Sequence, residues 1–436
     1  MSHPTFLNRQ ALHLRPDPAR VVVRPFKPAT EPRDLNPEDK TRANHILERV
    51  LALSPEEVSS QLADVLENFQ GRHRNLLEKF EQRAVEMEGA FADNDPGYTH
   101  AQRQLVGAYF LHEYSFEAAA LFNPSIIAHP DQAGVSEGAL RFILSLRAVG
   151  EGHISSLTFR SGTLAADGSV EIDPTARLAT IPSVTERTGG PLGDVVSLAF
   201  ENECELSERV IFPITASQSN GIEDARFVEM QDEKGKIFRA TYTAYSGAAI
   251  RSEMLETRDF LTFRMIPLAG PAARNKGMGL FPRKIDGKYA MIGRQDNENL
   301  HLLYSDDIYE WEEGEPFIKP QEPWEFVQIG NCGSPIELDE GWLLLTHGVG
   351  AVRRYSIGGV LLDKSDPSKI LARSREPLVR PEVSERHGYV PNVVYTCGAI
   401  RHGERIVLPY AVSDTFSNFA TIRISALLDA MEASSD

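Results

Sequence analysis

The spacing of apolar residues predicts helices in the first part of the chain, from about residue 36 to 119. Asn36-Pro37 and Ser54-Pro55-Glu56-Glu57 each place a capping side chain before a proline at the first helical position. After the second cap, apolar residues recur at three- and four-residue steps, at Val58, Leu62, Val65, Leu66 and Phe69. This spacing forms one face of a helix. A further helix is expected over about 100–119, through Leu105, Val106, Tyr109 and Phe110.

From Asn123 onward the pattern changes to short β-rich runs separated by glycine turns. Five of these turns are each followed by an apolar strand that ends in polar or aromatic residues. The turns are Glu137-Gly138, Lys234-Gly235, Asp286-Gly287, Glu340-Gly341 and His402-Gly403. The strand ends are Arg147, Tyr242 to Tyr245, Arg294, His347, and Tyr410 with Asp414. Three of the four intervals between turns are about fifty to sixty residues, near the length of a propeller blade.

The pattern therefore predicts an all-β fold, a five-bladed β-propeller over 120–436, preceded by an N-terminal arm and helical layer over 1–119. A β-sandwich of similar strand count is the alternative, since it shows the same turns. Equivalent strands of successive blades end at the same end of the central channel, so their polar ends would form one pocket. We expect the helical layer to pack on the main domain or to serve as a homo-oligomer contact.

Composition narrows the classes of partner and compartment. The formal net charge of −17 argues against nucleic acid or an anionic membrane surface as the main partner. Three scattered cysteines fit a reducing compartment, and without a C-x-x-C pair no metal site is expected. No apolar run reaches the length of a signal-peptide core near the start or of a membrane span later. These features favour a cytoplasmic protein.

One short segment, Gly221 to Arg226, sets two carboxylates and an arginine just before an apolar strand. Adjacent residues of an extended chain point to opposite faces, so Glu223 and Asp224 are not expected to face the channel together. A carboxyl group in a narrow, partly dry channel has its pKa raised by desolvation, as a general acid for glycosidic cleavage requires. A solvated turn with a local ion pair is the alternative interpretation of the same residues.

Several segments resemble glycoside hydrolase family 130, the β-mannoside phosphorylases and mannosidases, in the same order along residues 120–420. Gly221-Ile222-Glu223-Asp224-Ala225-Arg226 is similar to the G-x-E-D-P-R segment of that family, with Ala225 where proline is usual. The other matching segments are Leu121-Phe122-Asn123-Pro124, Ser145-Leu146-Arg147, Ser155 to Arg160, Tyr242 to Tyr245, Asn275 to Pro282, Gly341 to Val349, and Ser413-Asp414-Thr415.

The resemblance implies a five-bladed propeller with a single catalytic carboxylic acid, Asp224. It implies that inorganic phosphate, a co-substrate rather than a cofactor, attacks the anomeric carbon from the opposite face. The substrate would be a β-mannosidic oligosaccharide, and its contacts are expected from Asn123, Arg147, Arg160, Tyr245 and Asp414. Phosphate needs cationic donors. For these the sequence offers Lys276, Arg294 and His347.

One departure keeps a second reaction open. Gln328 stands where many of the phosphorylases carry lysine. An inverting hydrolase would use water instead, and it needs a carboxylate base roughly 6.5 to 9.5 Å from the acid. Asp296, Glu298 and Glu382 are candidates for that base, and Arg294 could pair with Asp296 or Glu298 instead of binding phosphate. The sequence favours a phosphorylase, with a hydrolase as the first alternative and a non-catalytic sugar-binding propeller as the second.

Overall fold

The computed structural model describes residues 7–29, 41–88 and 99–433. The chain divides into two compact units. The larger unit comprises Met1–Pro18, Phe116–Ala176 and Ile181–Asp436, and the smaller unit comprises Ala19–Ser115 and Arg177–Thr180. Within the described ranges, no helix combines the length and apolar character needed to cross a membrane. The predicted helix start at Asn36-Pro37 lies outside the described residues.

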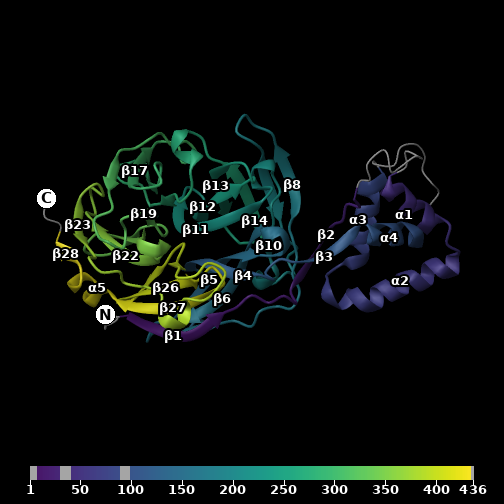
Figure 1. The fold of residues 1–436 in the computed structure, drawn as a ribbon, viewed down its shortest axis with the longest axis horizontal. Coiled ribbons are helices and arrows are strands. Elements are labelled where there is room, and N and C mark those ends of the chain that lie inside the picture. Colours follow the sequence, from purple (N-terminus) through teal and green to yellow (C-terminus); the bar gives the residue numbers. More distant parts are fainter. Residues whose placement is uncertain (1–6, 30–40, 89–98, 434–436) are drawn as a thin grey trace. The chain divides into compact units, whose positions relative to one another are not determined.

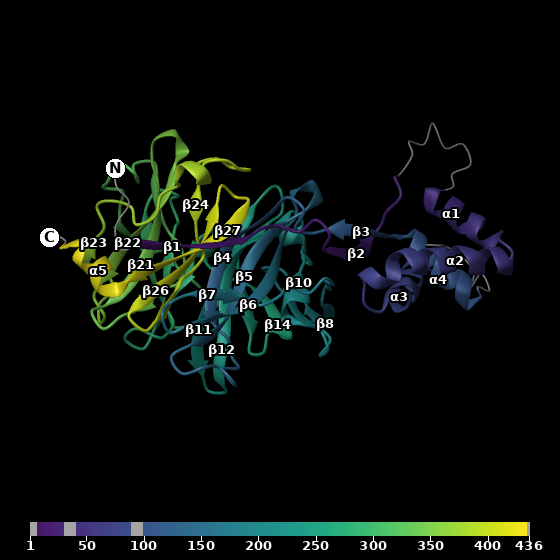
Figure 2. The ribbon, with the colours of Figure 1, turned by 90° about the horizontal axis from the view of Figure 1, so that it is seen from below.

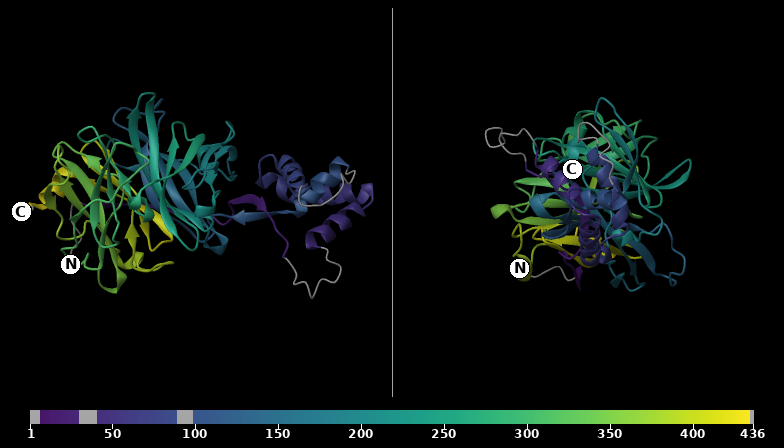
Figure 3. Two further views of the ribbon diagram at one scale, coloured as in Figure 1. Left: turned by 90° about the horizontal axis from the view of Figure 1, so that it is seen from above. Right: turned by 90° about the vertical axis from the view of Figure 1, so that its right-hand side faces the viewer.

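The smaller unit is mainly helical, and its helices pack on one another (purple and blue in Figure 3). The elements are β2 (Val21–Pro25), α1 (Arg42–Leu51), α2 (Pro55–Phe69), the short 3₁₀ turn η2 (Gln70–Arg72), α3 (Leu76–Glu88), α4 (His100–Tyr109) and β3 (Leu111–Ser115). The predicted cap of α2 is confirmed, because Ser54 and Glu57 form a reciprocal capping box. The prediction that the last helix continues to residue 119 is wrong. It ends at Tyr109, and residues 111–115 instead pair with β2 in an antiparallel ladder.

The larger unit is built from antiparallel strands that form several sheets around a central region (Figure 1). The longest sheet contains β4 (Ala120–Ala128), β5 (Leu140–Val149), β6 (Ser155–Leu164), β7 (Val170–Ile172), β8 (Ser183–Thr188), β9 (Val195–Ala199), β10 (Val210–Ile211), β11 (Gly221–Asp232), β12 (Gly235–Tyr245), β13 (Ile250–Thr257) and β14 (Thr262–Pro267). Its two halves meet where β6 and β11 pair in parallel through Gly221 and Ser155.

Three further sheets complete the larger unit. One contains β15 (Gly279–Leu280), β16 (Tyr289–Gly293), β17 (Leu300–Ser305) and β18 (Pro316–Ile318). The next contains β19 (Gln328–Asn331), β20 (Ile336–Glu337), β21 (Trp342–Val349), β22 (Tyr355–Leu362), β23 (Ile370–Arg373) and β28 (Glu432–Ala433). The last contains β1 (Leu7–Leu14), β24 (Val394–Tyr395), β25 (Ile400–His402), β26 (Arg405–Val412) and β27 (Phe416–Arg423), and α5 (Ile424–Asp429) follows it.

All five predicted glycine turns are confirmed. Their glycines adopt positive φ, a backbone region that glycine enters without steric cost. Each turn leads directly into a strand, and the five strands are β5, β12, β16, β21 and β26. The sequence thus predicted the same feature, a glycine turn followed by a strand, at five places along the larger unit.

The N-terminal strand β1 belongs to the larger unit. It pairs antiparallel with β27, joining Leu7 to Ile422 and Leu14 to Ser417, and the two strands run side by side in Figure 2. The expected division placed the whole of 1–119 outside the β-rich domain. That expectation fails for β1 because its alternation of half-buried and exposed positions completes a sheet edge left open by the last long strand.

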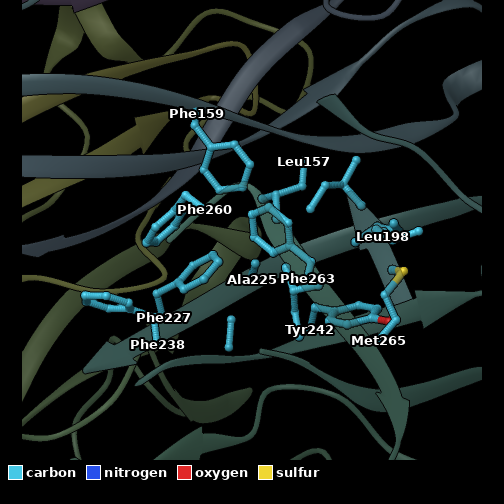
Figure 4. Close-up of a cluster of buried hydrophobic side chains, with 14 of the residues drawn as sticks. Leu157, Phe159, Leu198, Ala225, Phe227, Phe238, Tyr242, Phe260, Phe263 and Met265 are labelled. Carbon is cyan, nitrogen blue, oxygen red and sulfur yellow. The ribbon is translucent and has the colours of Figure 1, made fainter. Parts of the chain in front are cut away.

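A large aromatic cluster anchors β11, the strand that carries Asp224 (Figure 4). Phe260 stands at its centre, with its ring centroid 5.6 Å from that of Phe159 and 5.3 Å from that of Phe238. Ala225 is buried in the same cluster. Burial of Ala225 fixes the strand next to Asp224, and each buried aromatic ring contributes on the order of 1.5–3 kcal/mol by leaving water.

Candidate active site

A polar cavity of about 150 Å³ lies at the ends of the strands that the sequence singled out. It is lined by Asn123, Arg147, Asp224, Arg226, Lys276, Gly277, Arg294, His347, Arg353, Tyr355, Val393, Tyr395 and Asp414. Four of the five expected strand ends contribute a side chain to it, from or just after β5, β16, β21 and β26. The cavity therefore draws side chains from all four sheets of the larger unit or from the loops next to them.

Left-handed backbone at two bulges directs Asn123 and Asp224 into the cavity. Asn123 has φ 49° at a register shift in β4, and Asp224 has φ 54° at a register shift in β11. The Asn123 amide Nδ2 donates to Asp224 Oδ1 at 2.6 Å. Asparagine and aspartate tolerate this region better than other side chains, but it still costs free energy. Strain at two contacting polar residues is typical of a functional site.

The bulge at Asp224 also brings Glu223 and Asp224 to the same partner. Of the two carboxylates only Asp224 lines the cavity, as strand alternation suggested, yet both contact the guanidinium of Arg147. Arg147 Nη2 donates to Glu223 Oε1 at 2.6 Å, and Nη1 lies 3.4 Å from Asp224 Oδ1. The left-handed residue breaks the two-residue period, so neighbouring side chains converge.

Arg226 holds the backbone of Asp224 in place through hydrogen bonds. Its Nη1 donates to the backbone oxygen of Asp224 at 2.8 Å, its Nη2 to the hydroxyl of Tyr395 at 2.7 Å and its Nε to the backbone oxygen of Cys332 at 3.1 Å. The side chain is buried. Arg226 therefore ties the bulge of β11 to two other sheets by charge-assisted hydrogen bonds.

The electrostatics of Asp224 differ from the prediction. Burial opposes ionisation of the Asp224 carboxyl, but the positive charges of Arg147, Arg226 and Lys276 outweigh burial and hold its pKa below the usual value. The expectation of a raised pKa considered desolvation alone and left out the cations around the carboxyl. Asp224 is therefore ionised at neutral pH unless something neutralises those cations.

The anion-binding residues expected from the sequence all line the same cavity. Lys276 precedes β15, Arg294 follows β16, and His347 lies in β21. Arg294 Nη1 lies 3.3 Å from His347 Nε2. Burial and the charges of Arg294 and Arg226 lower the pKa of His347 well below its usual value. His347 is thus a neutral partner of Arg294, and Lys276 and Arg294 carry the positive charge.

Asp414 lies in a tight turn after β26, with φ 49°, and Ser413 before it has φ 47°. Burial raises the pKa of the Asp414 carboxyl to about 6, and the Asp224 charge adds to this increase while Arg147 opposes it. Arg353 and Tyr355 line the wall nearby, with the Arg353 guanidinium 5.7 Å from the centre of the Tyr355 ring. The cavity therefore holds two carboxyl groups with opposite pKa shifts.

Two residues expected to bind substrate do not line this cavity. Arg160 is buried, and its Nη2 contacts the carboxylate of Glu117 at 3.0 Å, so its charge is already paired. Tyr245 ends β12, and its hydroxyl donates to the backbone oxygen of Gly247 at 3.3 Å. Asn123, Arg147 and Asp414 are the expected substrate-binding residues that the structure brings together.

The residues tied to a hydrolytic mechanism also lie outside the lining of the cavity. Asp296 accepts hydrogen bonds from Asn299, which help to lower the pKa of the Asp296 carboxyl to about 2 despite partial burial. Glu298 is exposed, and Glu382 contacts Arg9. Gln328 is half-buried at the start of β19. Among the described residues, no group of three or more histidine, cysteine, aspartate or glutamate side chains could hold a metal ion.

Six lining residues were not assigned a role from the sequence: Arg226, Gly277, Arg353, Tyr355, Val393 and Tyr395. Arg226 was available in the Gly221 to Arg226 segment, where regular strand alternation would predict the same face for Asp224 and Arg226. Tyr355 and Tyr395 begin or end short strands that have no distinguishing motif. Arg353 lies in a loop that regular spacing cannot identify.

Comparison with known proteins identifies the family. A family model described as beta-1,4-mannooligosaccharide phosphorylase matches residues 194–433. The chain is 33% identical over 243 residues to a 1,2-beta-oligomannan phosphorylase of Thermoanaerobacter sp. strain X514, which covers 53% of this chain and 78% of that protein. It is 31% identical over 232 residues to a beta-1,2-mannobiose phosphorylase of Listeria innocua, which covers 51% of this chain and 63% of that protein.

Solved structures agree at the level of the fold. The beta-1,2-mannobiose phosphorylase from Listeria innocua, in complex with beta-1,2-mannobiose, superposes with a TM-score of 0.51 and 23% sequence identity. The match covers 72% of this chain and 92% of that chain. The matched family segment contains Asp224, Lys276, Arg294, His347 and Asp414. The chain belongs to glycoside hydrolase family 130.

Proposed function

We propose that the chain is an inverting phosphorylase that cleaves β-mannosidic bonds with inorganic phosphate and releases mannose 1-phosphate. The two relatives with about one-third identity described above are phosphorylases of β-mannosides by name. The observation that supports phosphorolysis most directly is the cavity itself. It sets one hydrogen-bonded carboxylate, Asp224, in the same small space as the cationic pair Lys276 and Arg294.

Each side of the cavity has a role in this reaction. Asp224 supplies the proton to the departing glycosidic oxygen, and Asn123 and Arg147 hold the Asp224 carboxyl in place. Phosphate would bind to Lys276 and Arg294, with His347 orienting the Arg294 guanidinium. Asp414 would accept hydrogen bonds from sugar hydroxyls. Phosphate oxygen forms the new bond to the anomeric carbon as the bond to the leaving sugar breaks, so no carboxylate base is required.

Phosphate binding would also raise the low pKa of Asp224, so that this residue could carry the proton that a general acid needs. The cations that keep Asp224 ionised include Lys276, which is a proposed phosphate ligand. A dianion bound beside Lys276 offsets that charge and adds negative potential, and both effects raise the pKa of Asp224. Binding of phosphate would thus be linked to proton uptake by the acid that needs the proton.

Hydrolysis is the second candidate, and two observations favour it. Gln328 replaces the expected lysine, and Asp414 is a second carboxyl in the cavity lining. A carboxyl with a pKa of about 6 is largely ionised at neutral pH and could activate water. Asp414 would replace Asp296, Glu298 and Glu382 as the candidate base, since those three lie outside the lining.

One experiment separates the two reactions. Purified enzyme is incubated with β-1,2- and β-1,4-mannobiose, with and without inorganic phosphate, and the products are identified. A phosphorylase forms mannose 1-phosphate only when phosphate is present. Release of two free mannose molecules at the same rate with and without phosphate would reject the proposal and leave the hydrolase.

We further propose that the larger unit is a five-bladed β-propeller in which the strand groups β4–β6, β11–β14, β15–β18, β19–β23 and β24–β27 with β1 are the blades. The five repeated turns support this division. The smaller unit would take no part in catalysis and would form a contact between copies of the chain. Phe69, Leu77 and Tyr109 are each exposed by more than one-third on it. Three buried free cysteines support a cytoplasmic location.

A further inference from the structure

Two loops on different sheets of the larger unit share one backbone conformation. The loop from Gly150 to Ile154 joins β5 to β6, and the loop from Gly350 to Arg354 joins β21 to β22. Both glycines are extended, with φ and ψ of −114° and −155° in the first loop and −105° and −165° in the second. Two left-handed residues follow in each loop, with φ of 68° and 57° in the first and 58° and 52° in the second.

Because the two loops have the same conformation, one residue of each loop occupies an equivalent position. His153 and Arg353 both occupy the second left-handed position. Each loop follows an inner strand that carries a cavity residue, Arg147 in β5 and His347 in β21. Arg353 itself lines the cavity. The repeat therefore gives His153 and Arg353 equivalent positions in two loops that each follow a strand carrying a cavity residue.

The Arg353 loop maintains this geometry at a cost. Val352 is a β-branched residue with φ 58°, whereas the equivalent position in the other loop is Gly152. The left-handed region costs a non-glycine residue on the order of 1–2 kcal/mol. Val352 is 93% exposed, so burial of its side chain does not offset this cost. The strain is consistent with a loop that is held in place to present Arg353.

Tyr389 connects the His153 loop to the Asp414 turn at the rim of the cavity. Its backbone N–H donates to Thr415 Oγ1 at 2.9 Å, and its hydroxyl lies 3.2 Å from His153 Nδ1. The ring centroids of His153 and Tyr389 are 5.4 Å apart. Gly388 packs so closely on the turn that an added Cβ would lie 2.6 Å from the Ser413 Cβ. Tyr389 is nevertheless 60% exposed, so a fixed aromatic face meets solvent beside the cavity.

The lining of the cavity indicates what this rim would contact. The acid Asp224 and the cations Lys276 and Arg294 all line the cavity. Because the acid and the cations lie inside, the transferred mannose must bind deepest. The leaving part of the substrate then extends outward across the rim.

We propose that Tyr389, His153 and Arg353 form a subsite for the outer mannose units of an oligomannoside, on the leaving-group side of the bond that is cleaved. This inference rests on the proposed function and deepens it, because it makes chains longer than a disaccharide the preferred substrates. Tyrosine suits this role because its rigid ring offers a large amphipathic surface at low conformational-entropy cost. Arg353 and His153 add hydrogen-bonding groups for sugar hydroxyls.

The test compares substrates of different length. For β-1,2- and β-1,4-linked mannobiose, mannotriose and mannotetraose, kcat/KM is measured with Tyr389→Ala and with Tyr304→Ala, an exposed tyrosine on β17 that serves as a matched control. Tyr389→Ala should lower the ratio of kcat/KM for tetraose to that for biose by roughly three- to tenfold, the range of one aromatic contact. Tyr304→Ala should leave the ratio unchanged. An unchanged ratio in Tyr389→Ala would overturn the subsite.

A binding measurement distinguishes failure of the subsite from failure of the proposed reaction. Calorimetric titration of Asp224→Asn protein with mannotetraose and mannobiose requires no turnover. Tighter binding of the tetraose, lost when Tyr389→Ala is added, supports the subsite whether phosphate or water is the nucleophile. Equal affinities for both lengths would reject it even if mannose 1-phosphate is formed.

Discussion

Two walls of one cavity hold carboxyl groups with opposite electrostatic behaviour. On the β11 wall, Asp224 is surrounded by Arg147, Arg226 and Lys276, and its pKa is lowered despite burial. On the turn after β26, Asp414 is also buried but has fewer cations to compensate, and its pKa rises to about 6. The two groups differ in their neighbours more than in their burial.

The contrast shows how a single cavity can assign different tasks to the same chemical group. Environments that separate two pKa values separate an acid from a base or ligand. A general acid usually has the higher pKa of such a pair. In this cavity the proposed acid, Asp224, has the lower pKa and is the more strongly ionised group. The cations that cause the reversal are the groups that phosphate would bind, so the reversal supports a reaction that starts with anion binding.

The largest effect should come from the β11 wall. Asp224→Asn keeps the shape of the side chain but cannot donate the proton, so kcat should fall by roughly 10²- to 10⁴-fold. Steady-state kinetics with mannobiose and phosphate measure the change. Glu223→Gln is the matched control, because Glu223 contacts the same Arg147 but does not line the cavity. Near-normal turnover of Asp224→Asn would exclude Asp224 as the acid.

The cations of that wall come next. Each charge-assisted hydrogen bond to phosphate contributes on the order of 1.5–3 kcal/mol, so Lys276→Met should raise the KM for phosphate by roughly ten- to a hundredfold. The KM for the mannoside should change less. Lys288→Met, an exposed lysine outside the cavity, provides the control. Equal losses for sugar and phosphate would argue against a dedicated phosphate site.

Phosphate should also change the protonation of the protein. We expect anion binding at pH 7 to be accompanied by proton uptake, measured by calorimetry in buffers of different ionisation enthalpy. Sulfate is the informative probe, because it does not titrate near neutral pH and any proton taken up must reach the protein. Asp224→Asn should abolish the uptake. Sulfate binding without proton uptake by the native protein would show that anion binding does not change the protonation of the carboxyl groups in the cavity.

A smaller effect is expected from the Asp414 wall, and it concerns stability. Because the folded pKa of Asp414 is about 6 and the usual value is 3.8, the folded state binds the proton more tightly. Stability is therefore lost as pH rises from about 4 to about 6. Asp414→Asn should stabilise the protein at pH 7 by on the order of 2 kcal/mol, while weakening the binding of mannoside. Thermal unfolding across pH 4–8 measures the difference, and an identical pH profile in both proteins would contradict it.

The smallest effect should come from Gln328→Lys. If Gln328 is a weakened phosphate position, the added charge should improve the KM for phosphate by a few-fold, since a partly exposed cation near an anion contributes roughly 0.2–1 kcal/mol. Initial rates at low phosphate measure this. No change would show that Gln328 lies too far from the anion, in agreement with its place outside the cavity lining.

Sequence reasoning located the strands better than it located their side-chain contacts. The five glycine turns and the ends of β5, β16, β21 and β26 could be predicted because turn chemistry and alternation are local properties. Arg160 and Tyr245 could not be judged, since their partners Glu117 and Gly247 decide where they point. The pKa of Asp224 could not be predicted either, because Lys276 and Arg147 come from other strands. The left-handed bulges gave no local signal.

The pairing of β1 with β27 has a consequence for synthesis of the protein. The ribosome makes residues 7–14 first, but the ladder they join needs residues 417–422, which emerge about four hundred residues later. The helices between residues 42 and 109 make mostly local contacts and can form early, whereas β1 must wait without a partner until residues 417–422 have been made. A chain that stalls before β27 leaves both β1 and its sheet with unpaired edges, which is a condition that promotes aggregation.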